Sequence, residues 1–243
     1  MRGMIDPHSH WVAGVDDGAR TVDDSAALLR ALAAAGFERV VATPHMRPGM
    51  FDNTAESLRR AYERTMAGLP SAGDLPERHL SSEHFFDDIV FQRLMRGEAL
   101  PYPGGHAALV EFPTRAFPLH LGHRFFDLAR RGITAVIAHP ERYEPVWKEP
   151  GLLDPLLDGG AVCLLDVAAL ADKYGRAPRR AAEKLVEAGY YHAACSDAHA
   201  AKDVRDVEEG IALLVELAGE EEARFLLREG PLQILEGRIE PSE

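Results

Sequence analysis

The sequence predicts an α/β fold in which seven strands alternate with helices and close into a (β/α)7 barrel. Seven short apolar runs alternate with segments of helical spacing, an order typical of a parallel sheet. The 243 residues suffice for one large core and no linker divides them, so we expect a single domain over residues 1–243. An open doubly wound sheet is the alternative. In either architecture, ligands gather at the carboxyl ends of the strands.

The expected strands are short apolar runs that end at polar or charged residues. They are Met4–Ile5, Val40–Thr43, Leu80–Ser82, Ala107–Phe112, Ala135–Ala138, Val162–Val167 and His192–Cys195.

The expected helices lie between these runs. Leu28, Leu32 and Ala35 share one face of the first, which Thr21 can cap with Asp24 three residues later. Further helical segments are expected at Pro118–Arg131, Pro178–Ala188 and Val204–Ala218. The glycines expected to end helices are Gly36, Gly132 and Gly189.

The composition excludes several classes of protein. The formal net charge of −12 argues against non-specific binding to nucleic acid or to an anionic membrane. No apolar run approaches the roughly 18 residues of a membrane span. The first candidate motif follows the start directly and leaves no room for a signal peptide, so we expect a cytoplasmic protein. Cys163 and Cys195 lie in apolar runs, which favours buried thiols over a disulfide.

Nine candidate metal ligands stand at or just past the ends of the expected strands. They are His8, His10, Asp17, His45, Glu83, Glu111, His139, Asp197 and His199. Because successive βα units aim side chains into one mouth, we expect them to meet in one site that holds up to three ions. Five imidazoles, four carboxylates and no thiolate suit Mn, Fe or Zn at a catalytic site.

Each candidate ligand has a simpler structural interpretation when it is considered alone. A single histidine is more often a hydrogen-bonded core residue, and Asp16-Asp17-Gly18 reads as a solvated turn. Glu111 is less ambiguous, because a carboxylate that closes the run Ala-Leu-Val-Glu-Phe is costly to bury unless a cation meets it. The coincidence of nine such positions favours metal binding.

Three arginines follow these ligands closely: Arg47, Arg142 and Arg205. Guanidinium groups match phosphate oxygens, although a surface charge or a salt bridge to a site carboxylate would also explain them. With metal ions that activate water, the set predicts hydrolysis of a phosphate monoester, and His199 is a candidate proton donor to the leaving group. A cysteine mechanism is disfavoured, because neither cysteine has an arginine six residues later.

The motifs around these residues resemble the PHP (polymerase and histidinol phosphatase) superfamily. Within it, the chain is similar to bacterial manganese-dependent protein tyrosine phosphatases of capsule and exopolysaccharide loci, from Met4 to about Phe225. The resemblance implies a distorted seven-stranded TIM-like barrel with a trinuclear metal site. The motifs that carry it are Ile-Asp-Pro-His8-Ser-His10, Val-Asp-Asp17-Gly, Ala-Thr-Pro-His45-Met-Arg, Ala-Leu-Val-Glu111-Phe, Val-Ile-Ala-His139-Pro-Glu-Arg142-Tyr and Ser-Asp197-Ala-His199.

The resemblance also implies how the ligands are shared among three ions. It places His8, His10, Glu83 and Asp197 on the first ion, Glu83 with Glu111 and His139 on the second, and Asp17, His45 and His199 on the third. Arg142 falls on the arginine that the family uses against substrate phosphate. Asp166 departs from the family pattern, because relatives often carry a polar amide there. The implied partner is a phosphotyrosine protein, in particular a bacterial tyrosine kinase of polysaccharide export.

Three other functions remain open from the sequence. A small-molecule phosphatase, such as one for histidinol phosphate, would use the same ions. An amidohydrolase commonly needs a bridging lysine, and no lysine here ends an expected strand. An inactive metal-binding domain that serves as an interaction module is the third. The native metal and the oligomeric state are also open, as is a role in substrate entry for the loop from Gly97 to His106.

Overall fold

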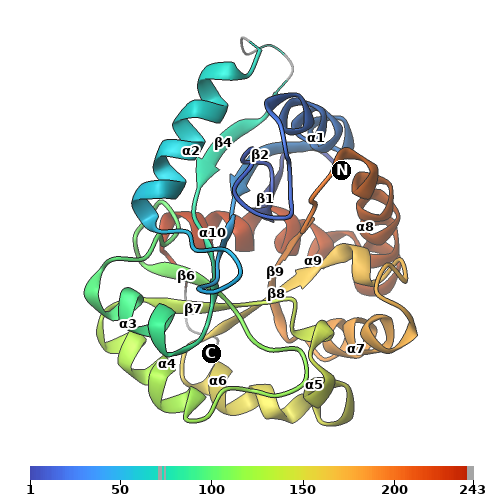
Figure 1. Ribbon diagram of the computed structural model, residues 1–243. Coiled ribbons are helices and arrows are strands. Elements are labelled where there is room, and N and C mark those ends of the chain that lie inside the picture. The colour runs from blue at the N-terminus through green and yellow to red at the C-terminus, as the bar shows by residue number, and fades with distance from the viewer. Residues whose placement is uncertain (71–72, 74, 240–243) are drawn as a thin grey trace.

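The protein has a mixed α/β fold with parallel sheets. The computed structural model describes residues 1–70, 73 and 75–239. The strands occupy the middle of the molecule and most helices lie around them (Figure 1). The strands are β1 (Met4–Ser9), β2 (Phe37–Ala42), β3 (His45–Met46), β4 (Glu77–Leu80), β5 (Glu83–Phe85), β6 (Ala107–Glu111), β7 (Thr134–Ala138), β8 (Val162–Asp166) and β9 (Tyr191–Cys195).

The helices follow the expected segments closely. The expected capping box of the first helix is confirmed, since Thr21 and Asp24 exchange side-chain and backbone hydrogen bonds, and Gly36 ends that helix with φ +107°. The helix expected from Pro118 begins three residues later, and the one expected from Pro178 begins two residues earlier. The helices are α1 (Val22–Ala35), α2 (Ala55–Gly68), α3 (Asp88–Arg96), α4 (Leu121–Arg130), α5 (Glu144–Lys148), α6 (Asp154–Asp158), α7 (Arg176–Glu187), α8 (Val204–Ala218), α9 (Glu220–Arg224) and α10 (Gly230–Glu236).

The strands form two parallel sheets, in the orders β1-β2-β4 and β3-β5-β6-β7-β8-β9. Two breaks divide the regions of the second and third expected strands, so the described part of the chain has nine strands and the seven-stranded barrel stays a prediction. Pro44, which has no N–H to donate, separates β2 from β3, and Ser81-Ser82 separates β4 from β5. The ladders of the described strands do not join the two sheets into one closed barrel, so closure stays a prediction.

The two sheets meet along two junctions. At the first junction the chain itself passes between them, and the Glu83 N–H donates to the Thr43 carbonyl at 3.2 Å while the Ser82 hydroxyl donates to the Pro44 carbonyl at 2.8 Å. The second junction joins the end of β1 to the segment after β9. There the His10 N–H donates to the Ala198 carbonyl at 2.9 Å. Both junctions lie at the carboxyl ends of strands.

The opposite end of the strands is closed by α10 and by the loop that precedes β6. The Tyr102 hydroxyl donates to the Pro7 carbonyl at 3.0 Å, and the Gly104 N–H donates to the Leu235 carbonyl at 2.7 Å. The loop from Gly97 to His106 also bonds to residues beside Glu83, since the Leu100 N–H donates to His84 Nε2 at 3.3 Å and the Ser81 hydroxyl donates to the Leu100 carbonyl at 3.1 Å. Its role in substrate entry stays a prediction. Both cysteines are buried free thiols. Among the described helices, none has both the length and the apolar character that crossing a bilayer requires.

Candidate metal centre

All nine predicted ligands meet at the carboxyl ends of the strands, around the two junctions. Their ligand atoms form four overlapping groups, and within each group the atoms lie within 4.8 Å of one another. The groups are His8 with His10 and Asp197, His8 with Glu83 and His139, His45 with Glu83 and Glu111, and His10 with Asp17, His45 and His199.

The deepest part of the site consists of His8, Glu83, His139 and Asp197, which we call the buried group. Their side chains are at most 3% exposed. His8 Nε2 lies 3.1 Å from Asp197 Oδ1 and 3.5 Å from Glu83 Oε1, and His139 Nε2 lies 3.0 Å from the same Glu83 oxygen. Glu83 therefore stands at the centre of this group.

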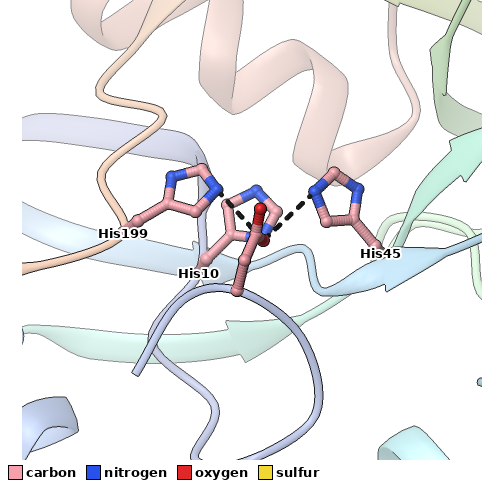
Figure 2. Close-up of side chains that lie close together, drawn as sticks. His10, His45 and His199 are labelled. Carbon is pink, nitrogen blue, oxygen red and sulfur yellow. Dashed lines mark ion pairs between the residues drawn. The ribbon is translucent and has the colours of Figure 1, made fainter. Parts of the chain in front are cut away.

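The outer part consists of Asp17, His45 and His199, which we call the rim group. Asp17 Oδ1 lies 3.4 Å from His45 Nε2 and 3.5 Å from His199 Nε2, and the Asp17 side chain is 56% exposed. Figure 2 shows His45 and His199 turned toward one carboxylate, with His10 beside them. The rings of His10 and His199 stack at 4.0 Å, so His10 links the rim group to the buried group.

Glu83 also connects the two groups. Its Oε2 lies 3.0 Å from His45 Nδ1, and Glu111 Oε2 lies 4.0 Å from that nitrogen. The implied third ligand set lies in one group. The first does so except for Glu83, whose oxygens lie 3.5 Å from His8 Nε2 and 3.6 Å from His10 Nε2. Glu111 and His139, however, fall in separate groups, so a shared ion for these two stays a prediction.

Several ligand atoms of the site are buried and make no hydrogen bond within the described part of the chain. They include His8 Nε2, His10 Nε2, Glu111 Oε2 and Asp197 Oδ1. Buried polar atoms are normally paired, and unpaired ones cost free energy. Imidazole nitrogens and carboxylate oxygens that converge without partners fit divalent cations, with ligand types that suit Mn, Fe or Zn.

The charges in the site agree with this interpretation. Burial alone would raise the pKa of Glu83 and of Asp197, but neighbouring histidines, His8 foremost, hold both well below the usual range. Burial lowers the pKa of His45, yet the carboxylates around it, Glu83 foremost, raise it to about 11. Ionised carboxylates attract cations, and a bound cation would displace the proton from such a histidine.

Two polar side chains orient the ligand histidines. The His8 Nδ1 atom lies 2.5 Å from the Thr43 hydroxyl, and the His10 Nδ1 atom lies 2.8 Å from Asp16 Oδ2. Asp16 also accepts the backbone N–H groups of His45 and Gly18, at 3.1 and 3.0 Å. Such contacts fix the ring orientation and leave Nε2 free for a metal ion. Neither role was predicted from the sequence, in which the Asp16-Asp17 doublet was the available signal for Asp16.

The backbone at the site is unusual at three positions. A Cβ on Gly18 would lie 2.1 Å from the His10 carbonyl oxygen, so only glycine lets this loop pass so closely. Asp197 and His139 have positive φ angles of +41° and +34°. Non-glycine residues seldom adopt this region, and such strain gathers at functional sites.

Arg142 lies against the buried group. Its Nη1 is 2.5 Å from Asp197 Oδ2 and 4.0 Å from Asp166 Oδ2, and its guanidinium lies 4.5 Å from the Tyr174 ring centroid. Burial alone would lower the pKa of Arg142, but the Asp197 carboxylate raises it. Asp166 is thus buried beside this arginine and helps to hold it at the edge of the site.

The other two predicted arginines have different surroundings. The Arg47 guanidinium lies 4.0 Å from the centroid of the Phe85 ring, beside Glu111. Arg205 is exposed in the first turn of α8, and no ion pair joins it to a candidate ligand in the described part of the chain. Its contact with phosphate stays a prediction.

The family was identified by comparison with known proteins. Residues 4–236 match the family model for capsular polysaccharide synthesis, CpsB/CapC. The chain belongs to this family. One CpsB/CapC relative is the tyrosine-protein phosphatase YwqE of Bacillus subtilis, which is 32% identical over 82% of this chain and 78% of its own length.

Two further comparisons cover nearly the whole chain. The tyrosine-protein phosphatase CpsB of Streptococcus pneumoniae is 25% identical over 96% of this chain and 98% of its own length. A crystal structure from work on YwqE of B. subtilis and CpsB of S. pneumoniae, described as metal-dependent tyrosine phosphatases, superposes with a TM-score of 0.88 at 29% identity. It covers 99% of this chain and 100% of its own.

Proposed function

We propose that this protein is a metal-dependent phosphatase that removes phosphate from tyrosine residues of proteins. The observation that carries the proposal is the convergence of nine candidate ligands around Glu83, with Arg142 beside Asp197. Membership of the CpsB/CapC family supports it, because the relatives compared above are named tyrosine phosphatases. Divalent ions held there would activate water and offset negative charge on the phosphate.

The chain's own residues would bind and orient the substrate. The Arg142 guanidinium, held by Asp197, offers its remaining N–H groups to phosphate oxygens at the edge of the site. His199 is 28% exposed on the rim, with Nδ1 3.0 Å from the Asp197 carbonyl oxygen and Nε2 3.5 Å from Asp17 Oδ1. It would donate a proton to the leaving phenolate only while its Nε2 holds no ion. We infer that the ions are manganese, with iron or zinc as alternatives, and that up to three bind each chain. We further infer one domain over residues 1–243, whose sheets form the distorted seven-stranded barrel.

The substrate we propose is a phosphotyrosine protein, in particular a bacterial tyrosine kinase of polysaccharide export. The first test is hydrolysis of a phosphotyrosine peptide by purified protein, before and after chelation and readdition of Mn²⁺, with bound metal quantified. We expect release of phosphate to be restored as the metal content rises. Turnover of histidinol phosphate but not of the peptide would favour the small-molecule alternative. Absence of bindable metal would contradict the proposal.

The Arg142→Ala variant tests the phosphate role directly. We expect turnover to fall about a hundredfold or more with the metal content retained, because one charge-assisted contact to the transition state is lost. Arg142→Lys serves as the conservative variant and should recover part of the rate. Unchanged turnover in Arg142→Ala would contradict this role, and absence of turnover in every form of the protein would favour the interaction-module alternative.

A further inference from the structure

Two separate cavities border the candidate metal ligands, and they share no lining residue. One, of about 280 Å³, reaches Glu111, while the other, of about 640 Å³, reaches Asp17 and His199. A phosphoryl group at the ligands could therefore carry the rest of its substrate into either cavity. The composition of the walls distinguishes them.

The Glu111 cavity has mixed walls that combine two phenylalanines and a proline with polar and charged side chains, Arg115 among them. Phe85, Phe112 and Pro113 line it, and Arg47 covers the Phe85 ring with its guanidinium 4.0 Å from the ring centroid. Thr114 stands exposed at the rim. Phe85 and the guanidinium over it thus provide an aromatic ring and a planar cation, two groups against which a substrate ring packs favourably.

The Glu111 cavity is also held rigidly. Phe112 is 1% exposed and packs against other aromatic rings, with centroids 5.4 Å from Tyr143 and 5.5 Å from Phe117. The Glu144 N–H donates to the Thr114 carbonyl at 2.7 Å and fixes the rim. A preformed cavity near the lower limit of small-molecule sites, roughly 300 Å³, suits one ring better than a folded peptide.

The cavity at Asp17 lacks such walls. It is lined by Gly18, Ala200 and charged side chains that include Arg20 and Lys202. The ring among its lining residues is the His199 imidazole, a candidate metal ligand that already stacks on His10 at 4.0 Å. An aryl group would gain less by entering it.

We propose that the Glu111 cavity is the subsite that binds the aromatic ring of the phosphotyrosine substrate. This inference rests on the proposed function and adds to it the direction in which the substrate lies. With the ring between Phe85 and Pro113, above the buried Phe112, the phosphate attached to it lies toward Glu111. Arg47 lines this cavity together with Glu111, and Arg142 lies against Asp197 of the buried group. Arg47 then contacts the ring and Arg142 the phosphate.

The test fills each cavity in turn by substitution of an exposed rim residue. Thr114→Trp fills the Glu111 cavity, and Lys202→Trp is the matched change at the Asp17 cavity. For Thr114→Trp we expect the KM for a phosphotyrosine peptide to rise about tenfold. The inhibition constant of inorganic phosphate, which has no ring, should stay unchanged. Lys202→Trp should leave both constants near those of the unsubstituted protein. Circular dichroism and metal content establish that each variant is folded and loaded.

The possible outcomes separate this inference from the proposed function. If the unsubstituted, metal-loaded protein does not cleave the peptide, the proposed function fails and the subsite falls with it. If it cleaves the peptide and Lys202→Trp alone raises the KM, the ring lies in the other cavity. If neither variant raises the KM, or if Thr114→Trp weakens inorganic phosphate equally, the cavity binds no ring and the inference is overturned.

Discussion

The buried group and the rim group differ in how the protein holds them. Glu83 and Asp197 of the buried group are 1% and 3% exposed, whereas Asp17 and His199 of the rim group are 56% and 28% exposed. Charges taken out of water must be compensated, while exposed charges are partly screened by solvent. The buried group therefore depends on cations for its stability more than the rim group does.

The two groups also differ in their backbone. His8 and Glu83 lie in strands β1 and β5, and Asp197 is fixed by its N–H bond to the His8 carbonyl at 3.0 Å. Asp17 lies in the loop between β1 and α1. We expect an ion at the rim to exchange more readily than ions at the buried group, because its ligands are less constrained.

The largest effect is expected from Glu83→Gln. Glu83 belongs to two of the four ligand groups and lies between the buried group and His45, so its loss should release ions from both. We expect turnover to fall on the order of a thousandfold, because metal activation is worth several kcal/mol. Metal analysis of the purified variant measures the loss, with the exposed Glu98→Gln as a control. Full metal content in Glu83→Gln would contradict the central position of Glu83.

Asp17→Asn should have a smaller effect that is confined to the rim. Asp17 belongs to one ligand group only, and both of its histidine contacts lie in the rim group. We expect the bound metal to fall by about one ion per chain and turnover to fall on the order of a hundredfold. Chelator titration followed by metal analysis checks this. Loss of all ions together would show that the two groups bind metal cooperatively.

Asp16→Asn tests the residue that orients His10, the histidine that links the rim group to the buried group. The substitution weakens the contact to His10 Nδ1 but keeps a side chain of similar shape. Changes of this kind typically cost 10- to 100-fold in metal affinity, and we expect a value of about tenfold, read by titration of metal into chelated protein. The exposed Asp23→Asn is the control. If the affinity is unchanged, Asp16 serves only the fold of its loop.

Glu141 lies behind the site, and we expect Glu141→Gln to have the smallest effect on turnover. Burial, aided by Asp166, raises the pKa of Glu141 to about 8, and the carboxyl contacts the Asp166 N–H and the Tyr191 hydroxyl. Between about pH 5 and about pH 8 the folded protein keeps a proton that the unfolded chain releases. The free energy of unfolding should therefore decrease as the pH rises through this window. The decrease should be smaller in Glu141→Gln, which lacks the titrating carboxyl.

Chemical denaturation of both proteins at a series of pH values measures this difference. The two unfolding free energies should diverge by a few kcal/mol across the window, in favour of the variant at high pH. Parallel curves would show that Glu141 does not titrate in the folded protein within this range.

Much of the site was predictable because its residues follow local patterns. Alternating apolar and helical segments indicate parallel strands, and each predicted ligand lies at or shortly after the end of one of them. The capping box at Thr21 was predicted for the same reason, since both partners are only three residues apart. A prediction of this kind needs no knowledge of distant contacts.

By itself, the sequence determined the alternation of strands and helices and the residues offered as ligands, because local spacing encodes both. The tertiary structure decided the break at Pro44, the bond of Asp16 to His10 and the pairing of Arg142 with Asp197. It also decided the second junction, where Asp6 accepts from Ser196 across 190 positions of the chain. These features depend on which strand ends meet in space. No local sequence pattern specifies which strand ends meet, because packing of the whole chain brings these partners together.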